Sequence, residues 1–253
     1  MAGALKFTVS GRSKTNDVPI LTFLAKAYGG IPIRLVDSVF GFVEKSTLYG
    51  GRVFDGAELT PGDVETLYEV GIGVRIPFTN HYAEPAEYEA TAPLLEKYHR
   101  PGNAVIVTND ALAGWIRRDY PQYRIEASVI KNLKSYDKIA AALDLYDTAV
   151  LPMEYSEDHA FLARLPQKDR ITLFANAGCA LTCPSRICYN SISKFNKAHT
   201  GELLCSQPLK RRQARGVIEF DLGPLQALGF SRFKVLTPNK GAAWGLAQKR
   251  HVA

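Results

Sequence analysis

The stretch NAVIVTNDALAGWIRRDYPQYRIEAS, residues 103–128, decides the fold class of this chain. Its two ends, 103–107 and 123–128, are short runs rich in apolar and β-branched residues, a composition typical of buried strands. The amphipathic segment between them, 110–118, predicts a helix. A strand, a helix and a second strand in this order form the repeating unit of a parallel sheet.

The same alternation continues in both directions along the chain. Further strands are expected at 5–9, 31–36, 74–78, 148–151, 170–175 and 232–236. Helices are expected at 18–28, from 60 onward, and at 88–98, 135–145, 156–164 and 224–228, with a Gly-rich loop or hairpin at 41–56. About eight such units in one chain of this size predict an α/β fold, a single (β/α)8 TIM-type barrel over residues 1–253. No G-x-G-x-x-G follows the first strand, which weakens the competing doubly wound sheet.

Composition favours a globular, cytoplasmic protein. Hydrophobic residues make up 46% of the chain and charged residues 22%, and no apolar run approaches the ~20 residues that span a membrane. The net charge of +6 favours an anionic partner such as RNA, a nucleotide or an acidic metabolite. The densest basic cluster, interpreted either as a solvated surface or as a polyanion contact, is Lys210, Arg211, Arg212 and Arg215.

All four cysteines lie in one loop, 176–205, expected after the seventh strand: Cys179, Cys183, Cys188 and Cys205. A tight group of thiols in a cytoplasmic protein indicates metal or redox chemistry. Thiolates bind both iron–sulfur clusters and zinc. The lack of a second C-x2–4-C knuckle, and Pro184 directly after a cysteine, favour an iron–sulfur cluster over zinc. Free or disulfide-paired thiols are the third interpretation.

Polar residues stand where the apolar runs stop, and in a barrel these positions surround the active site. The candidate pocket residues are Asp37, Thr79, Asn80, Thr108, Asn109, Ser128, Glu154 and Asn176. Taken singly, such residues are more often loop starts or helix caps. Glu154 is the candidate general base. Asn176 and Arg186 are further catalytic candidates, and Arg186 either steers an anionic substrate toward the cysteines or lies on the surface.

A hydrolase has little support from sequence motifs. None of the five histidines forms H-E-x-x-H, and no serine stands in G-x-S-x-G.

Residues 123–238 resemble peptidase family U-32, the collagenase-like peptidases. The resemblance rests on the segment 126–132, the strand 150–154 that ends in a glutamate, the cysteine loop 179–188, and the closing strand 228–235. It implies a TIM barrel. Several members are similar to oxygen-independent hydroxylases that carry a 4Fe–4S cluster on four cysteines. Their substrates include a tRNA uridine, an rRNA cytidine and a quinone precursor. Prephenate is implicated as the oxygen donor in some of them. The cysteine spacing here is tighter, Leu236-Thr237-Pro238 replaces the usual Gly-Arg, and no RNA-binding domain is added.

These observations predict a U32-like iron–sulfur enzyme, with Cys179, Cys183, Cys188 and Cys205 as ligands. We expect hydroxylation or a related redox modification of an RNA base or a small aromatic molecule, with no role for a membrane or for DNA. Zinc is the alternative metal. A peptidase is one alternative function, and a non-catalytic, metal-stabilised barrel acting as a subunit, for example beside a related barrel, is another.

Overall fold

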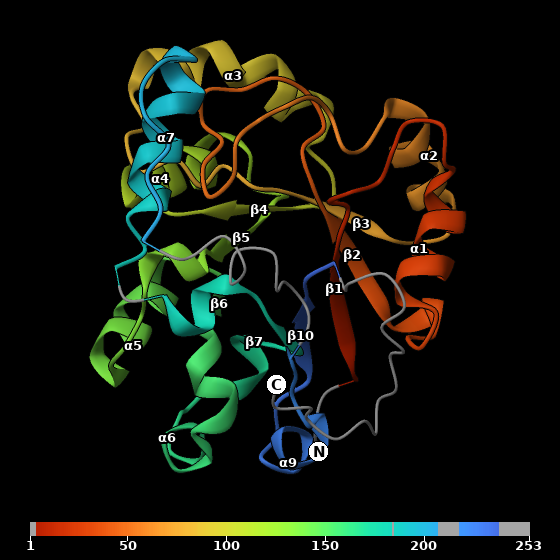
Figure 1. The fold of residues 1–253 in the computed structure, drawn as a ribbon, viewed down its shortest axis with the longest axis vertical. Helices are drawn as coiled ribbons and strands as arrows, with labels where there is room; N and C mark the ends of the chain where they lie inside the picture. The colour runs from red at the N-terminus through yellow and green to blue at the C-terminus, as the bar shows by residue number, and fades with distance from the viewer. Residues whose placement is uncertain (1–3, 184, 207–217, 238–253) are drawn as a thin grey trace.

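Eight parallel strands close into a barrel in the computed structural model, which describes residues 4–183, 185–206 and 218–237 (Figure 1). The strand order around the barrel is β1-β10-β7-β6-β5-β4-β3-β2. The strands are β1 Lys6–Ser10, β2 Val36–Phe40, β3 Gly73–Ile76, β4 Ala104–Val107, β5 Arg124–Ala127, β6 Thr148–Val150, β7 Ile171–Phe174 and β10 Arg232–Val235. The prediction of a (β/α)8 barrel is confirmed.

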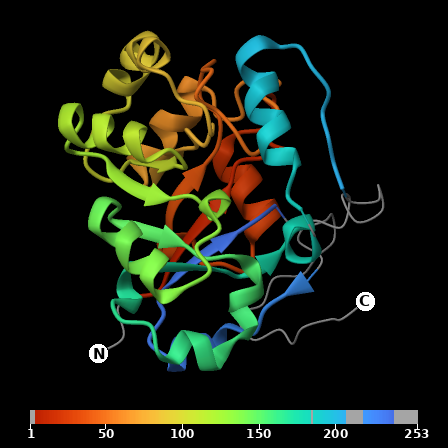
Figure 2. The same cartoon turned by 90° about the vertical axis from the view of Figure 1, so that its left-hand side faces the viewer.

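Helices surround this barrel (Figures 1 and 2). They are α1 Ile20–Tyr28, α2 Pro61–Glu69, α3 Pro85–Lys97, α4 Asp110–Asp119, α5 Tyr136–Leu145, α6 His159–Ala163 and α9 Leu222–Ala227. The start of α2 shows why the sequence predicts them: Thr60 and Asp63 form a reciprocal capping box, with Pro61 at the first helical position. Within the described residues, no helix is long and apolar enough to cross a membrane.

Two of the expected elements have other bounds in the structure. The segment expected as a strand at 31–36 instead forms a 3₁₀ turn, Ile33–Leu35, and the strand begins only at Val36. Pro32 precedes the turn and has a fixed φ and no N–H to donate to a sheet, which explains the shift. The helix expected at 156–164 is split into a 3₁₀ segment, Met153–Glu157, and the short α6, because Asp158 caps a new start.

The inside of the barrel is polar, whereas its outer surface is apolar. Glu126 of β5 is fully buried and contacts side chains of four other strands, which only the barrel interior brings together. Its carboxylate lies 2.7 Å from Arg75 Nη1 and 3.0 Å from Lys234 Nζ, with the hydroxyls of Thr148 and Thr172 at 3.5 and 3.4 Å. The alternate residues of the same strands are apolar and belong to the core beneath the helices.

The segment between β7 and β10 carries the cysteines. It contains β8 Asn176–Ala177, which pairs antiparallel with β9 Ile218–Glu219, then the 3₁₀ turn Cys179–Thr182 and the helix α7 Cys188–Ala198. The segment leaves the carboxyl-terminal end of β7, on the face where (β/α)8 enzymes place their active sites.

Candidate functional site

Helix α7 is fastened to the loops that follow β2 and β3. Asn80 is fully buried, and its amide nitrogen lies 2.8–3.3 Å from three backbone carbonyl oxygens, including that of Ser193 in α7. From α7, Asn196 donates to the carbonyl oxygens of Tyr49 and Arg52 at 3.1 and 2.9 Å. The structure therefore corrects the expected role of Asn80, which anchors α7 and does not face a pocket.

The loop at 41–59 closes this side of the barrel with aromatic side chains. The Tyr49 ring stacks on Phe78 at 5.7 Å and lies 4.5 Å from Phe42. Gly50 packs so closely against the backbone of Thr79 that a Cβ atom would overlap it. This close approach explains why position 50 is a glycine.

His81 and Ser193 form a pair that resembles part of a hydrolase site. His81 Nδ1 lies 3.2 Å from Ser193 Oγ, and burial lowers the pKa of His81. Ser193, however, is fully buried on the inner side of α7. A nucleophile must reach the substrate, so this hydroxyl is not placed to attack a peptide bond.

Other polar residues at the strand ends also have structural roles. Asn109 and Ser128 each accept a capping hydrogen bond from a backbone N–H of the following helix or turn. Thr79 and Thr108 are buried. These positions match the general tendency of such residues to cap elements, and the pocket roles of Asn109 and Ser128 stay predictions.

Asn176 is fully buried and serves as a backbone clamp. Its Oδ1 accepts from the Leu236 N–H at 2.8 Å, and its Nδ2 donates to the Leu236 carbonyl O at 2.9 Å. The side chain thereby links the two chain segments just beyond the ends of β7 and β10. It fixes the start of the cysteine segment, and the structure does not give it the catalytic role expected from the sequence.

Close packing fixes the point where the cysteine loop begins. A Cβ atom on Gly178 would lie 2.8 Å from Leu236 Cδ1, so a larger residue here would require the Leu236 side chain to move. The Gly178 N–H also points at Met153 Sδ, 3.3 Å away. Cys179 opens the 3₁₀ turn that follows, and Cys183 comes directly after that turn.

A chain reversal brings Cys205 back to the other cysteines. After α7, His199 adopts a left-handed conformation and Gly201 has φ of 104°, so the chain turns and runs back along the helix (Figure 2). Ser191, one turn after Cys188, accepts from the Leu204 N–H at 3.1 Å. On the far side, Ser206 Oγ lies 3.5 Å from Cys183 Sγ.

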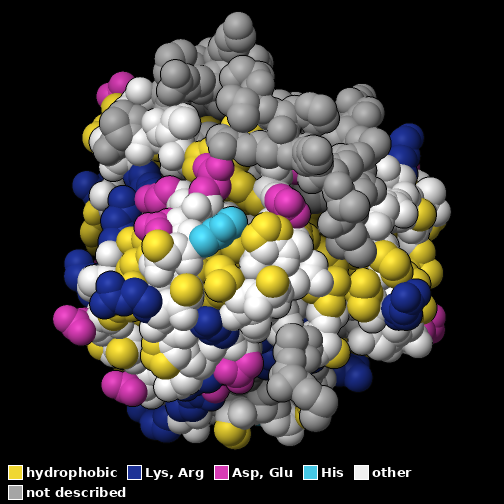
Figure 3. Space-filling view, turned by 90° about the horizontal axis from the view of Figure 1, so that it is seen from below, with side chains coloured by type: hydrophobic (Ala, Val, Ile, Leu, Met, Phe, Trp, Pro, Cys, Tyr) yellow, Lys and Arg dark blue, Asp and Glu magenta, His cyan; other side chains and the backbone are white. Residues whose placement is uncertain are grey.

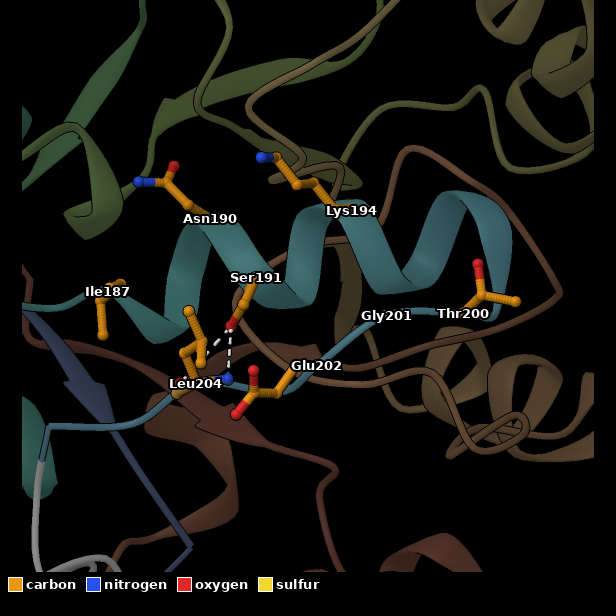
Figure 4. A pocket seen from close by; sticks show the side chains of 8 residues that line it. All are labelled: Ile187, Asn190, Ser191, Lys194, Thr200, Gly201, Glu202 and Leu204. Atoms are coloured by element: carbon orange, nitrogen blue, oxygen red, sulfur yellow. Dashed lines mark hydrogen bonds between the residues drawn. The ribbon is translucent and has the colours of Figure 1, made fainter.

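A groove of about 400 Å³ separates α7 from the returning segment (Figure 4). It is lined by Ile187, Asn190, Ser191, Lys194, Thr200, Gly201, Glu202 and Leu204. Ser191 points across it to the backbone of Leu204 (Figure 4). Because Ile187 and Leu204 are about two-fifths exposed, the part of the groove nearest the cysteines is apolar.

The electrostatics of Cys188 place all four thiols near one another. Burial, followed by the proximity of the other three cysteines, raises the pKa of Cys188 to about 11. The four cysteines form no disulfide. A protonated thiol is a poor nucleophile, so Cys188 in this state does not resemble the activated thiolate of a cysteine peptidase.

The four thiols are not arranged as the ligand set of a single ion. Tetrahedral zinc with Zn–S bonds of about 2.3 Å needs sulfur atoms only ~3.8 Å apart. No group of three or more Cys, His, Asp or Glu side chains in the described parts of the chain is close enough to hold one ion. Multi-iron clusters do not require this spacing, because a different thiolate can bind each iron.

Arg186 joins the cysteine loop to the ends of β5 and β6. Its backbone N–H lies 3.2 Å from Cys183 Sγ, and its guanidinium contacts both oxygens of Glu154, at 3.0 and 3.1 Å, as well as Asn132 Oδ1. Lys134 Nζ lies 3.1 Å from Glu154 Oε1. Arg186 is therefore engaged by the protein itself, which leaves it a positioning role.

The same contacts bear on Glu154 as a general base. Burial raises the pKa of Glu154, but a backbone hydrogen bond, the Lys134 hydrogen bond and the Arg186 charge lower it more, so the pKa lies below its usual value. A base works best when its pKa is near the working pH. Glu154 is thus better suited to hold Arg186 than to accept a proton from a substrate.

Asp37 lies at the opposite end of the barrel from the cysteine loop. It is the second residue of β2 rather than the first residue after a strand, and the pairing of β1 with β2 shifts by one residue there. This bulge turns its carboxylate toward Arg75, 2.8 Å away. The expected pocket role of Asp37 is therefore corrected.

The basic cluster Lys210, Arg211, Arg212 and Arg215 lies outside the described residues. On the face seen in Figure 3, the Lys and Arg side chains are interspersed with acidic and apolar ones. The excess positive charge of the chain is therefore not gathered into one patch among the coloured residues of that face.

Comparison with solved structures tests the fold directly. A U32 peptidase aligns with 98% of this chain and 96% of its own length, with a TM-score of 0.63 at 11% sequence identity. The chain has the fold of a U32 peptidase. A fusion protein of a xylose isomerase-like TIM barrel and 4-hydroxyphenylpyruvate dioxygenase aligns with 96% of this chain and 40% of its own length, at 15% identity and a TM-score of 0.45. No protein-family model and no curated protein matches the sequence.

Proposed function

We propose that this chain is a U32-like enzyme that holds an iron–sulfur cluster on Cys179, Cys183, Cys188 and Cys205. Its reaction would be an oxygen-independent hydroxylation, or a related redox modification, of an RNA base or a small aromatic molecule. The cytoplasm is the compartment that suits this proposal, because its thiol pool keeps cysteines reduced and available as ligands.

The return of Cys205 is the observation that carries the proposal. Sixteen residues separate it from Cys188, and a surface cysteine at that distance has no reason to approach the others. Here Ser191 accepts a hydrogen bond from Leu204, directly before Cys205, and Cys183 contacts Ser206, directly after it. Contacts on both sides of Cys205 therefore hold it beside the other three cysteines, which supports the proposal that all four bind one cluster.

The position of the cysteines supports catalysis over a purely structural role. They follow β7 on the carboxyl-terminal face, where (β/α)8 enzymes place their chemistry. A bound cluster would supply one-electron transfer at this face. Around it, the Arg186 N–H directed at Cys183 Sγ would favour the thiolate form, and the contacts of Arg186 with Glu154 and Asn132 would keep the loop in place.

Substrate binding would use the apolar surface beside the cysteines. Ile187, Leu203 and Leu204 are exposed apolar residues next to the cysteine loop. Flat aromatic rings and unstacked bases bind such surfaces favourably. Replacing an aromatic hydrogen by hydroxyl is a two-electron oxidation. With an oxygen donor at the oxidation level of water, a separate acceptor would have to take the two electrons.

The experiment compares cells that express the wild-type chain with cells that express Cys183→Ala. RNA nucleosides and small aromatic metabolites from both are analysed by mass spectrometry. The proposal predicts a species heavier by one oxygen atom that depends on the wild-type chain, also under anaerobic growth. Identical profiles in both strains would contradict the catalytic part of the proposal.

Peptide hydrolysis is the second candidate, because the aligned solved structure is named a peptidase. It requires an activated nucleophile that a substrate can reach. Metal-free protein that cleaves peptides, and loses this activity in Glu154→Ala but not in Cys183→Ala, would favour it. A non-catalytic barrel would show neither an oxygenated product nor cleavage.

A further inference from the structure

The amino-terminal end of the barrel gathers positively charged side chains. Lys6, Arg124 and Arg232 are the first residues of β1, β5 and β10. Lys6 and Arg232 are direct partners in neighbouring parallel strands, so their side chains share one face. Their common acidic neighbour is Asp37, which lies 3.5 Å from Lys6 Nζ and 4.0 Å from Arg124 Nη1.

Asp37 is already committed to a cation deeper in the barrel. Its Oδ2 lies 2.8 Å from Arg75 Nη2, and Arg75 also binds Glu126, 2.7 Å away. Glu126 in turn holds Lys234 at 3.0 Å. Each of the two carboxylates is thus already paired with a buried cation, without counting Lys6, Arg124 and Arg232 at the amino-terminal mouth of the barrel.

The charges of this network do not balance. Lys6, Arg75, Arg124, Arg232 and Lys234 are positive, whereas the carboxylates within the network are only two, Asp37 and Glu126. Three positive charges are in excess. The parts of the sequence outside the described residues contain no Asp or Glu side chain that could compensate them.

Arg232 is the most enclosed of the three cations at the mouth. Its Nε donates to the carbonyl O of Asp169 at 2.6 Å. Burial, followed by the nearby charge of Arg124, lowers its pKa, although Asp37 and Glu126 act in the opposite direction. Two guanidinium groups held near each other at a partly buried position repel, and a bound anion would remove that cost.

We propose that the amino-terminal mouth of the barrel binds a small phosphate-bearing dianion between Lys6, Arg124 and Arg232. A phosphate carries close to two negative charges near neutral pH, and its oxygens match the forked N–H groups of arginine. Lys6 and Arg124 remain 41% and 38% exposed, so an anion can reach them from solvent. The ligand is either free inorganic phosphate or the phosphate group of a metabolite.

This site is independent of the proposed cluster because the two lie at opposite ends of the barrel strands. The Cys183→Ala variant, which lacks a proposed cluster ligand, is therefore expected to bind phosphate as the wild type does. Failure of one proposal leaves the other intact.

The test measures the thermal unfolding midpoint and the calorimetric affinity of the full chain for inorganic phosphate and for glycerol phosphate. Sodium chloride at equal ionic strength is the reference. The variants are Lys6→Gln and Arg124→Gln, which alter side chains that are more than a third exposed and are expected to fold. The control is Arg118→Gln, which removes an arginine that is 69% exposed and pairs with its neighbour Asp119.

We expect phosphate to raise the midpoint of the wild type and of Arg118→Gln alike. Arg124→Gln and Lys6→Gln should bind it about tenfold more weakly or worse, because each loses a charge-assisted contact. Tighter binding of glycerol phosphate would identify a metabolite as the source, and equal or weaker binding would identify free phosphate. A midpoint shift no larger than that of chloride, or wild-type affinity in Arg124→Gln, would overturn the proposal.

Discussion

Replacing Ser191 by alanine tests how the chain holds Cys205. The Ser191 hydroxyl accepts from the Leu204 N–H at 3.1 Å. Its single proton goes either to the Leu204 carbonyl O at 3.4 Å or to that of Cys188 at 3.1 Å. Ser191→Ala therefore removes one full hydrogen bond to the returning segment and part of a second.

The expected cost is local rather than global. Losing these contacts weakens the closed position of the segment by about 1–1.5 kcal/mol. That energy corresponds to a roughly tenfold rise in the open population. Alanine is the better helix former by ~0.5 kcal/mol, so α7 itself and the free energy of unfolding of the whole chain should change little.

Hydrogen exchange of the Leu204 amide in metal-free protein measures this opening directly. We expect exchange about tenfold faster in Ser191→Ala and unchanged in Ser185→Ala, which alters an exposed serine of the same loop. In protein loaded with iron and sulfide, the variant should also lose iron faster. A Leu204 amide that exchanges at the wild-type rate in Ser191→Ala would refute the clamp.

Three further predictions concern the barrel and the anchor of α7. Glu126→Gln leaves Arg75 and Lys234 buried without their carboxylate and should lower the free energy of unfolding by about 3–5 kcal/mol in urea titrations. Burial raises the pKa of Glu126, but Lys234 and Arg75 lower it more, so its pKa in the folded protein lies below the ordinary value of 4.5. The stability that the ionised carboxylate contributes is therefore complete above pH 4.5 and is lost as the pH falls through the folded pKa. Urea titrations from pH 6 to pH 3 would show this loss. Asn80→Ala removes a buried amide that faces three carbonyl oxygens and should cost about 2–3 kcal/mol, whereas the exposed Asn190→Ala should change stability by less than ~0.5 kcal/mol.

The barrel could be predicted from the sequence because its strands are buried on their outer face against helices. Runs such as 104–107 and 171–174 are apolar and β-branched, and each is bounded by turn or capping residues. The second strand was misplaced because Ile31, Ile33 and Val36 give an apolar pattern across a proline-initiated turn. Local composition does not show where such a turn ends and the strand begins.

The candidate site was less predictable because its polar residues act through partners far along the chain. Asn80 meets α7 more than a hundred residues later, and Asn176 meets Leu236 across sixty residues. Nothing in the local sequence separates these anchors from pocket residues. Ser191 was not predicted either, although its position three residues after Cys188 placed it on the same helix face as that cysteine.

The central claim is that the four cysteines share one cluster. The most direct measurement is the iron and acid-labile sulfide content, with the visible spectrum, of protein purified without oxygen, beside Cys183→Ala and Cys205→Ala. The account predicts a brown wild-type protein with about four irons and four sulfides per chain, and loss or marked depletion of both in each variant. A colourless wild-type protein with one zinc or no metal, or a Cys205→Ala variant with unchanged iron content, would contradict it.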